Sequence, residues 1–319
     1  MKDLIMKTNF QQIDQLLLRS EKIILIGHQR PDEDALGAVL SFYIYLKSLG
    51  KEVKIFVNDP PPSYLSFMPE IDRVSTDRQL FDEHYDLYVF LDCGSIGNTR
   101  LSEDLIAGKT VLNIDHHISN VNYGTLNYVD SHASSTCEIV YEFFKSIGYK
   151  MDKRIATCLL SGILGDTSGF IHSTTRAETV KIASELIKTG IKIHQIFDFV
   201  VRNKTIGGLR LWGEILSRLR VNTEFNIAYS WIKDTDFTDY NVKEDELDGI
   251  ANFLNAIVDV NATALFRISD NRLKASWRTK RNDVDLSKFC GLFGGGGHKK
   301  ASGFALDVKV IEKDGGLMV

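Results

Sequence analysis

Cysteine is scarce in this sequence, and its placement excludes the usual cysteine-based sites. The four cysteines, Cys93, Cys137, Cys158 and Cys290, are far apart and form no CxxC pair. This spacing argues against a zinc ribbon and against a small secreted domain held together by disulfides. We therefore expect a protein of the reducing cytoplasm.

Long apolar runs and an excess of positive charge are also missing. No segment approaches the ~20 apolar residues that a membrane span needs, and the N-terminal MKDLIMKTNFQQI has no apolar signal core. The net charge is -4, whereas a protein that coats nucleic acid non-specifically needs a basic surface. We expect no membrane partner, and any nucleic-acid ligand should be short and bound locally.

The length and composition favour two globular domains. The chain has 319 residues, of which 44% are hydrophobic and 25% are charged. That length exceeds one average domain, and the apolar content is sufficient for two cores. No internal repeat or low-complexity segment is visible.

In the first half, short apolar runs alternate with segments of helical periodicity. The expected strands are residues 22–27, 52–57, 86–92 and 110–115, and helices are expected at 35–49, 135–147, 153–164 and 175–189. Near-continuous apolar strands separated by helices predict an α/β domain with a parallel sheet and helices on both faces. Ligands of such sheets bind beyond the carboxyl ends of the strands.

The second half has a different pattern. A polar helical stretch at residues 191–221 is followed by strand-like segments at 226–232, 262–269 and 272–279, with a helical segment at 244–258. We expect a catalytic domain at 1–190, a helical linker at 191–221 and a smaller C-terminal α+β domain at 222–319.

Acids and histidines follow three of the expected strands, and a further acid ends an apolar helical run. These residues are His28, Asp32 and Asp34, then Asp92, then Asp115, His116 and His117, and finally Asp166. A single acid at a strand end is usually a helix cap or a turn residue. A parallel sheet, however, brings its strand ends to one edge, so these side chains should lie together.

Such a cluster of carboxylates favours divalent cations. Several carboxylates within a few ångströms repel one another and raise one another's pKa, and bound cations remove that cost. Oxygen and imidazole ligands without thiolate suit Mn²⁺ or Mg²⁺ better than structural zinc. Two ions about 3.5–4 Å apart can activate water and stabilise the leaving oxygen of a phosphoryl displacement.

Four segments resemble motifs of the DHH phosphoesterase superfamily, in order along the chain. They are HQRPDEDALGA, LDCGS, NIDHHISN and GILGDTSGF, and the later FGGGGHKKASG is similar to the glycine-rich motif of the DHH-associated domain. The resemblance covers nearly the whole chain and is greatest to NrnA-type enzymes. It implies hydrolysis of very short oligoribonucleotides (nanoRNA, pApA) and dephosphorylation of 3'-phosphoadenosine 5'-phosphate (pAp).

The resemblance also implies a role for each motif residue. One of two Mn²⁺ ions would be bound by His28, Asp32 and Asp92, and the other by Asp34, Asp92, His116 and Asp166. Asp115 and His117 would orient these ligands or contact the substrate, so that the catalytic group is Asp92, Asp115, His116 and His117. The general acid is either His117 or a water molecule.

Two positions depart from the family pattern. Glu33 stands where relatives commonly have glycine, and it would be strained if that position needs a positive φ. The motif GDTSGF has its glycine, Gly169, one position later than the usual GDTG. Neither change removes an expected ligand.

The second domain carries glycine at four successive positions, 294–297. Backbone without side chains lets N–H groups approach an anion closely, although a tight turn before a helix is an alternative. The resemblance implies that Arg278, Gly295, Gly296, Gly297 and His298 bind a substrate phosphate. Phe304 is either a stacking platform for a base or the first apolar residue of a strand.

Three other functions fit parts of the sequence. A family II inorganic pyrophosphatase shares the catalytic domain but lacks the GGGGH segment. A long-strand exonuclease would carry additional domains and a basic channel. A nucleotide-binding regulator would be expected to lack metal ligands. We also expect a homodimer.

Overall fold

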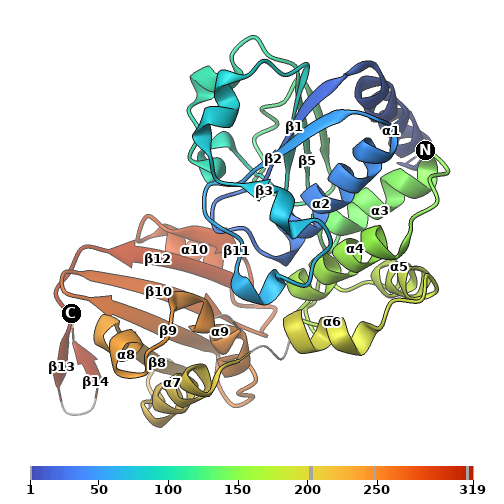
Figure 1. Ribbon diagram of the computed structural model, residues 1–319. Helices are drawn as coiled ribbons and strands as arrows, with labels where there is room; N and C mark the ends of the chain where they lie inside the picture. The colour runs from blue at the N-terminus through green and yellow to red at the C-terminus, as the bar shows by residue number, and fades with distance from the viewer. Residues whose placement is uncertain (1, 201–203, 248, 314–315, 319) are drawn as a thin grey trace. The chain divides into compact units, whose positions relative to one another are not determined.

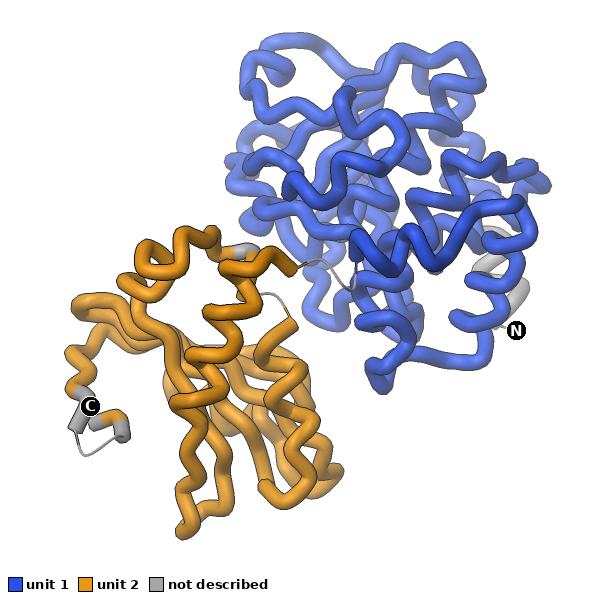
Figure 2. The backbone as a smooth tube through the Cα atoms, turned by 60° about the horizontal axis from the view of Figure 1, so that its bottom comes forward, with its two compact units in different colours: residues 1–203 blue, residues 204–319 orange. Residues whose placement is uncertain are grey.

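The computed structural model describes residues 2–200, 204–247, 249–313 and 316–318. The chain forms two compact units, Met1–Asn203 and Lys204–Val319, which Figure 2 shows in different colours. The segment 191–221 contains the boundary between these units, and its residues 201–203 lie outside the described residues. No helix in the described part of the chain is long and apolar enough to cross a membrane.

A six-stranded parallel sheet forms the centre of the first unit, in the order β3-β2-β1-β4-β5-β6. Figure 1 labels four of its strands, β1, β2, β3 and β5. The strands are β1 (Lys22–Ile26), β2 (Glu52–Phe56), β3 (Val74–Ser75), β4 (Leu87–Leu91), β5 (Val111–Asp115) and β6 (Leu126–Val129). The parallel α/β prediction is confirmed. The outer strands β3 and β6 are too short for their apolar pattern to predict them.

Helices cover both faces of this sheet, but they differ in kind. The α-helices are α1 (Lys2–Arg19), α2 (Glu33–Ser48), α3 (Thr136–Ser146), α4 (Lys153–Asp166), α5 (Ala177–Ile187) and α6 (Ile193–Val200). Their buried residues form one core with one face of the strands. The other face packs mainly against η3 (Arg78–Asp82), η4 (Ile96–Thr99) and η5 (Glu103–Ile106), which are 3₁₀ helices. Two more 3₁₀ helices, η1 (Ser63–Leu65) and η2 (Ile71–Arg73), complete the unit.

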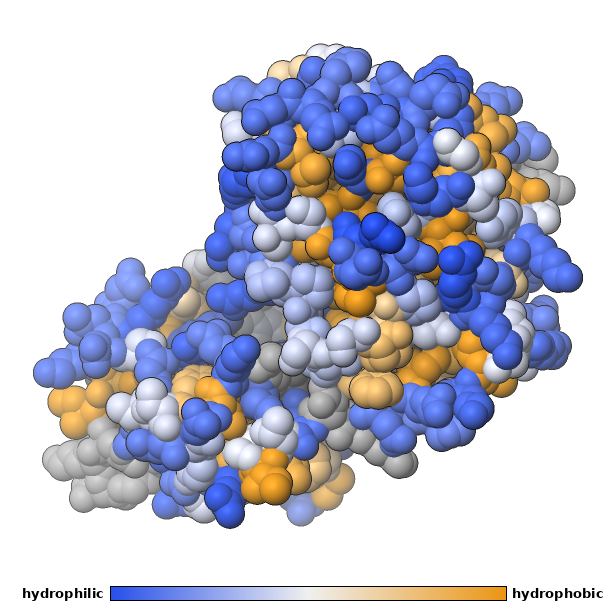
Figure 3. Space-filling model, viewed as in Figure 1, coloured by the Kyte–Doolittle hydropathy of each residue, from blue (hydrophilic) through white to orange (hydrophobic). Residues whose placement is uncertain are grey.

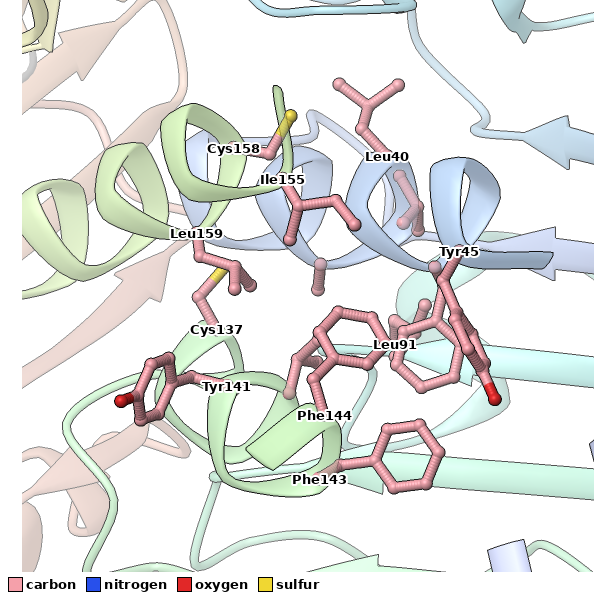
Figure 4. Packing of buried hydrophobic residues seen from close by; sticks show 14 of the residues in the cluster. Leu40, Tyr45, Leu91, Cys137, Tyr141, Phe143, Phe144, Ile155, Cys158 and Leu159 are labelled. Carbon is pink, nitrogen blue, oxygen red and sulfur yellow. The ribbon is translucent and has the colours of Figure 1, made fainter. Parts of the chain in front are cut away.

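Helices α2, α3 and α4 approach one another closely around Cys137. Figure 4 shows side chains of the three helices, including Tyr45, Phe144 and Ile155, converging in this core. A Cβ added to Gly37 would lie 2.7 Å from Cys137 Sγ, and one added to Gly162 would lie 2.4 Å from it. The two glycines therefore permit the close packing that brings α3 and α4 to the start of α2.

The second unit contains a mixed six-stranded sheet in the order β11-β12-β10-β9-β8-β7. In this sheet β8 and β9 pair in parallel, and the other strand pairs among the described residues are antiparallel. The strands are β7 (Arg220–Asn222), β8 (Ile227–Lys233), β9 (Ala262–Ser269), β10 (Arg272–Arg278), β11 (Gly296–His298) and β12 (Ala301–Leu306). A separate hairpin is formed by β13 (Ile311–Lys313) and β14 (Gly316–Met318).

Helices lie on both faces of the second sheet, which confirms the α+β prediction. One face packs against α7 (Ile206–Ser217), α8 (Asp234–Asp239), η6 (Glu244–Leu247) and α9 (Ile250–Leu254), and the other packs against α10 (Leu286–Gly291). The helix expected at 244–258 is instead two short helices, η6 and α9, and Gly249, with a φ of 89°, is the N-cap of the second. Hydrophilic residues cover much of the surface in view in Figure 3, since each unit keeps its apolar residues largely in these cores.

Candidate metal centre

The carboxyl ends of β1, β4 and β5 are neighbours in the first sheet, so the residues that follow them meet at one edge. Asp92 follows β4 directly and is 4% exposed, with a φ of 61° in the left-handed region. It lies at the centre of the expected ligands.

The first group of possible ligand atoms consists of His28, Asp32 and Asp92. His28 Nε2 lies 3.5 Å from Asp32 Oδ1 and 3.4 Å from Asp92 Oδ2. Asp32 is also the N-cap of α2, because its Oδ1 accepts hydrogen bonds from the backbone N–H groups of Asp34 and Ala35. The same carboxylate thus starts the helix and faces the histidine.

The second group consists of Asp34, His116 and Asp166. His116 Nε2 lies 3.1 Å from Asp166 Oδ2 and 3.7 Å from Asp92 Oδ1. Asp34 belongs to the first turn of α2, and Asp166 is the last residue of α4. A third group joins Asp92 and His116 to His117, and within each group the ligand atoms lie within 4.8 Å of one another.

The start of α3 holds two of these carboxylates, a feature that the strand-end pattern does not reveal. The backbone N–H groups of Thr136 and Cys137 donate to Asp34 Oδ2 and Oδ1 at 2.6 and 2.8 Å. The Thr136 hydroxyl donates to Asp92 Oδ1 at 3.0 Å. The sequence signal for this helix start is Ser135, whose side chain accepts from the Glu138 N–H.

Asp115 and His117 form a pair beside the two groups. His117 Nδ1 lies 2.8 Å from Asp115 Oδ1, and Asn120 Nδ2 donates to Asp115 Oδ2 at 2.6 Å. Burial alone would raise the pKa of Asp115, but hydrogen bonds from His117 and Asn120 outweigh it and hold the pKa below its usual value. The His117 side chain is 40% exposed, so its ring is accessible to a ligand.

The electrostatics of the cluster fit divalent cations. Burial, followed by the charge of Asp92, raises the pKa of Asp34 well above its usual value. Burial also raises the pKa of Asp166, whereas the pKa of His116 is raised because its contact with Asp166 outweighs burial. Crowded carboxylates of this kind are stabilised by positive charge. The donors are carboxylate oxygens and imidazole nitrogens without thiolate, which suit Mn²⁺ or Mg²⁺.

Glu33 has no positive φ, so the strain considered from the sequence does not arise. It is the first residue of α2, where an acidic side chain interacts favourably with the helix dipole. Tyr64 donates its hydroxyl hydrogen to Glu33 Oε1 at 2.9 Å. A Cβ on Gly165 would lie 2.7 Å from Glu33 Cβ, so the glycine before Asp166 provides the space for this glutamate.

The turn after Asp166 accommodates the displaced glycine of its motif. Ser168, Gly169 and Phe170 all have positive φ values, of 47°, 70° and 72°. Ser168 Oγ lies 2.9 Å from His172 Nε2, and His172 Nδ1 lies 2.8 Å from the Asp166 carbonyl oxygen. These contacts stabilise a turn in which a serine occupies a conformation that glycine adopts more readily.

In the second unit, Arg278 and Gly296 line a cavity of about 420 Å³ on the sheet. Arg278 Nε donates to Asn252 Oδ1, burial lowers the pKa of Arg278, and no carboxylate in the described part of the chain pairs with it. A half-buried guanidinium without a carboxylate suits an anionic ligand.

The other glycine-motif residues lie on or beside β11. A Cβ on Gly295 would lie 2.1 Å from the Gly303 oxygen, and one on Gly297 would lie 2.6 Å from the Ala301 oxygen. Close packing of β11 on β12 therefore requires these two glycines. His298 ends β11 and is exposed. The Phe304 ring packs on Phe293 with a centroid distance of 4.6 Å, as expected for an apolar strand residue.

Comparison with known proteins identifies the class. The model of the DHH family, N-terminal domain, matches residues 22–163, and the DHHA1 domain matches residues 224–313. The protein belongs to the DHH family, which is a family of metal-dependent phosphoesterases.

Its relatives span nearly the whole chain. Two are named bifunctional oligoribonuclease and PAP phosphatase NrnA. The one from Bacillus subtilis is 28% identical over 90% of this chain and 90% of its own. The one from Thermus thermophilus is 30% identical over 89% of this chain and 84% of its own. The crystal structure of an exopolyphosphatase-related protein from Bacteroides fragilis has a TM-score of 0.86 and 26% identity, covering 93% of this chain and 90% of that one.

A pyrophosphatase is similar over a shorter region. A protein of Enterococcus faecalis, named "Probable manganese-dependent inorganic pyrophosphatase", is 26% identical over 167 residues, which are 52% of this chain and 54% of its own. This similarity covers about half of the chain, whereas the NrnA relatives match about nine-tenths of it.

Proposed function

We propose that this protein hydrolyses short oligoribonucleotides, including nanoRNA and pApA, to mononucleotides and dephosphorylates pAp. The observation that carries the proposal is the convergence of His28, Asp32, Asp34, Asp92, His116 and Asp166 at the edge of the first sheet. The names of the full-length relatives from B. subtilis and T. thermophilus support the choice of substrates.

The proposed ligands of one ion are His28, Asp32 and Asp92, and those of the other are Asp34, Asp92, His116 and Asp166. When bound, two Mn²⁺ ions would activate water and stabilise the leaving oxygen of an in-line displacement at phosphorus. Asp92 is shared between the two ligand sets, because its Oδ2 faces His28 and its Oδ1 faces His116.

We assign His117 to the substrate rather than to the ions. The contact between Nδ1 and Asp115 keeps a proton on Nδ1 and fixes the orientation of the ring. Nε2 is then the ring atom available to a phosphate or leaving-group oxygen. Asp115 is 0% exposed and acts by positioning His117.

Arg278 is the proposed phosphate contact in the second unit. Its guanidinium can bind two oxygens of one phosphate, which a lysine cannot do. Gly296 and the neighbouring backbone of β11 leave room for the anion beside it. We include Gly295, Gly297 and His298 in this site, the glycines because they position β11 on β12.

A substrate panel tests the proposal. Purified protein with Mn²⁺ is incubated with pAp, pApA, RNA of two to ten nucleotides and pyrophosphate, and initial rates are compared. We expect hydrolysis of pAp, pApA and RNA of two to five nucleotides. Failure to hydrolyse pApA and pAp would refute the proposal, and hydrolysis of pyrophosphate alone would favour the pyrophosphatase alternative. Binding of nucleotides without turnover would favour a regulator.

Two variants separate chemistry from substrate binding. Asp92→Ala should abolish turnover, because it removes the ligand that both sets share. Arg278→Ala should chiefly raise KM, because the arginine lies in the second unit and contacts the proposed phosphate. Wild-type rates in Asp92→Ala would show that the two-metal assignment is wrong.

A further inference from the structure

The cavity on the second sheet extends well beyond Arg278. Residues of β10, β11 and β12 line it, among them Lys274, Ser276, Arg278, Gly296, Gly303 and Ala305. Side chains alternate along a strand, so Lys274, Ser276 and Arg278 share one face of β10. The alternate residues Ala275 and Trp277 pack in the core with α10, on the opposite face.

Strand pairing arranges the cavity in three successive rows. Arg278 pairs with Ala301, which pairs in turn with His298. Ser276 pairs with Gly303 and then Gly296, and Lys274 pairs with Ala305. The residues of β12 in these rows are alanine or glycine, and their small size leaves an open track along β10 from Arg278 to Lys274.

Both ends of this track carry an uncompensated positive charge. Within the described ranges, neither Arg278 nor Lys274 forms an ion pair, and Lys274 forms no hydrogen bond with its side chain. The acids Asp234 and Glu244 form ion pairs with Arg267, which is the strand partner of Lys274 on β9.

The distance along β10 between Arg278 and Lys274 makes them two separate positions for binding phosphate. Four residues along a strand span about 13 Å, which is too far for one phosphate group to contact both side chains. We propose that Lys274 binds a second phosphate of a single-stranded oligoribonucleotide, two nucleotides beyond the phosphate at Arg278. The inference rests on the proposed function for the identity of this ligand.

A second phosphate position makes the role of Lys274 depend on substrate length. The two phosphates of a 5'-phosphorylated dinucleotide are only one nucleotide apart, so with one of them at Arg278 the other falls short of Lys274. A chain of three or more nucleotides has a further phosphate that can reach it. Lys274 therefore contributes to binding of the longer substrates and not of pApA or pAp.

Binding without turnover tests this directly. Affinities of 5'-phosphorylated oligoadenylates of two and five nucleotides, labelled at the 3' end, are measured by fluorescence anisotropy in EDTA for the wild type and Lys274→Gln. The matched control is Lys288→Gln, which removes the same charge from the exposed face of α10 on the other side of the sheet.

We expect Lys274→Gln to weaken binding of the five-nucleotide chain about fivefold at low salt, and to reduce the slope of log affinity against log salt by about 1. Binding of the dinucleotide by Lys274→Gln, and of both chains by Lys288→Gln, should stay at the wild-type level.

Three results would overturn the inference: no binding of the longer chain by the wild type, no effect of Lys274→Gln, or equal weakening of both chains. The result is independent of turnover. Selective weakening of the five-nucleotide chain supports the subsite even if the wild type with Mn²⁺ hydrolyses neither RNA.

Discussion

Thr136 offers a sharp test of how the fold holds the proposed metal ligands. The residue is fully buried, its hydroxyl donates to Asp92 Oδ1 at 3.0 Å, and its backbone N–H donates to Asp34 Oδ2. Thr136→Val replaces the hydroxyl by a methyl group of similar size and keeps the β-branched shape. The change removes the donor to Asp92 while leaving both backbone hydrogen bonds to Asp34.

The expected cost follows from the charge of the acceptor. A hydrogen bond to a charged group contributes about 1.5–3 kcal/mol, which corresponds to about 10- to 150-fold in an equilibrium constant. Loss of a group that orients a metal ligand typically weakens metal binding about 10- to 100-fold. We therefore expect Thr136→Val to bind Mn²⁺ at least about tenfold more weakly than the wild type.

Free Mn²⁺ is counted by electron paramagnetic resonance during titration of the metal-free protein, which gives affinity and stoichiometry without an activity assay. Thr136→Ser keeps the hydroxyl and should retain affinity close to that of the wild type. Circular dichroism establishes that each variant is folded. A folded Thr136→Val protein with wild-type affinity and stoichiometry would refute the reasoning.

Three further outcomes are expected. Gly162→Ala should lower the free energy of unfolding, measured by urea denaturation, by about 1–3 kcal/mol. The reason is that the alanine Cβ would lie 2.4 Å from Cys137 Sγ and 2.8 Å from Asp34 Oδ1. Unchanged stability would contradict this packing. Added Mn²⁺ should raise the melting temperature above its value in EDTA. A free Mn²⁺ concentration of 100 times Kd adds about 2.7 kcal/mol per site to the free energy of unfolding. An unchanged melting temperature would count against a metal site. Burial alone would raise the pKa of Asp236, but the bidentate contact with Arg218 outweighs burial and lowers that pKa. The ion pair therefore stabilises the fold above the usual aspartate pKa of about 3.9, and this stabilisation is lost as the pH falls below that value. Asp236→Asn should accordingly be less stable by about 3–5 kcal/mol at pH 7, with a smaller difference from the wild type near pH 3. A difference independent of pH would refute this.

Much of the first unit is predictable because its signals are local. The apolar runs that become β1, β2, β4 and β5 are visible in the sequence, since buried parallel strands need apolar residues on both faces. The residues after β1, β4 and β5 follow from the same pattern, because neighbouring parallel strands end at one edge. The sequence therefore predicts that the histidines and aspartates of the proposed site lie near one another.

Glu33 shows where motif comparison alone was insufficient. Relatives commonly have glycine at this position, so from the sequence Glu33 would be strained if a positive φ were needed there. The structure shows instead a regular first helical residue whose carboxylate accepts from Tyr64 and packs against Gly165. These partners are remote in the sequence, and only the packing of α2 against α4 and η1 brings them together.

By itself, the sequence determined the class of both domains, the parallel strand ends and the residue types of the proposed metal centre, because these depend on local periodicity and on motifs within short segments. Tertiary structure alone decided that Thr136 and Cys137 hold Asp34, although they are about a hundred residues away in the chain. It also decided that Lys274 shares a face with Arg278 beside open space on β12. The physical reason is that hydrogen bonds and cavities depend on which segments pack together, and no local pattern encodes that pairing.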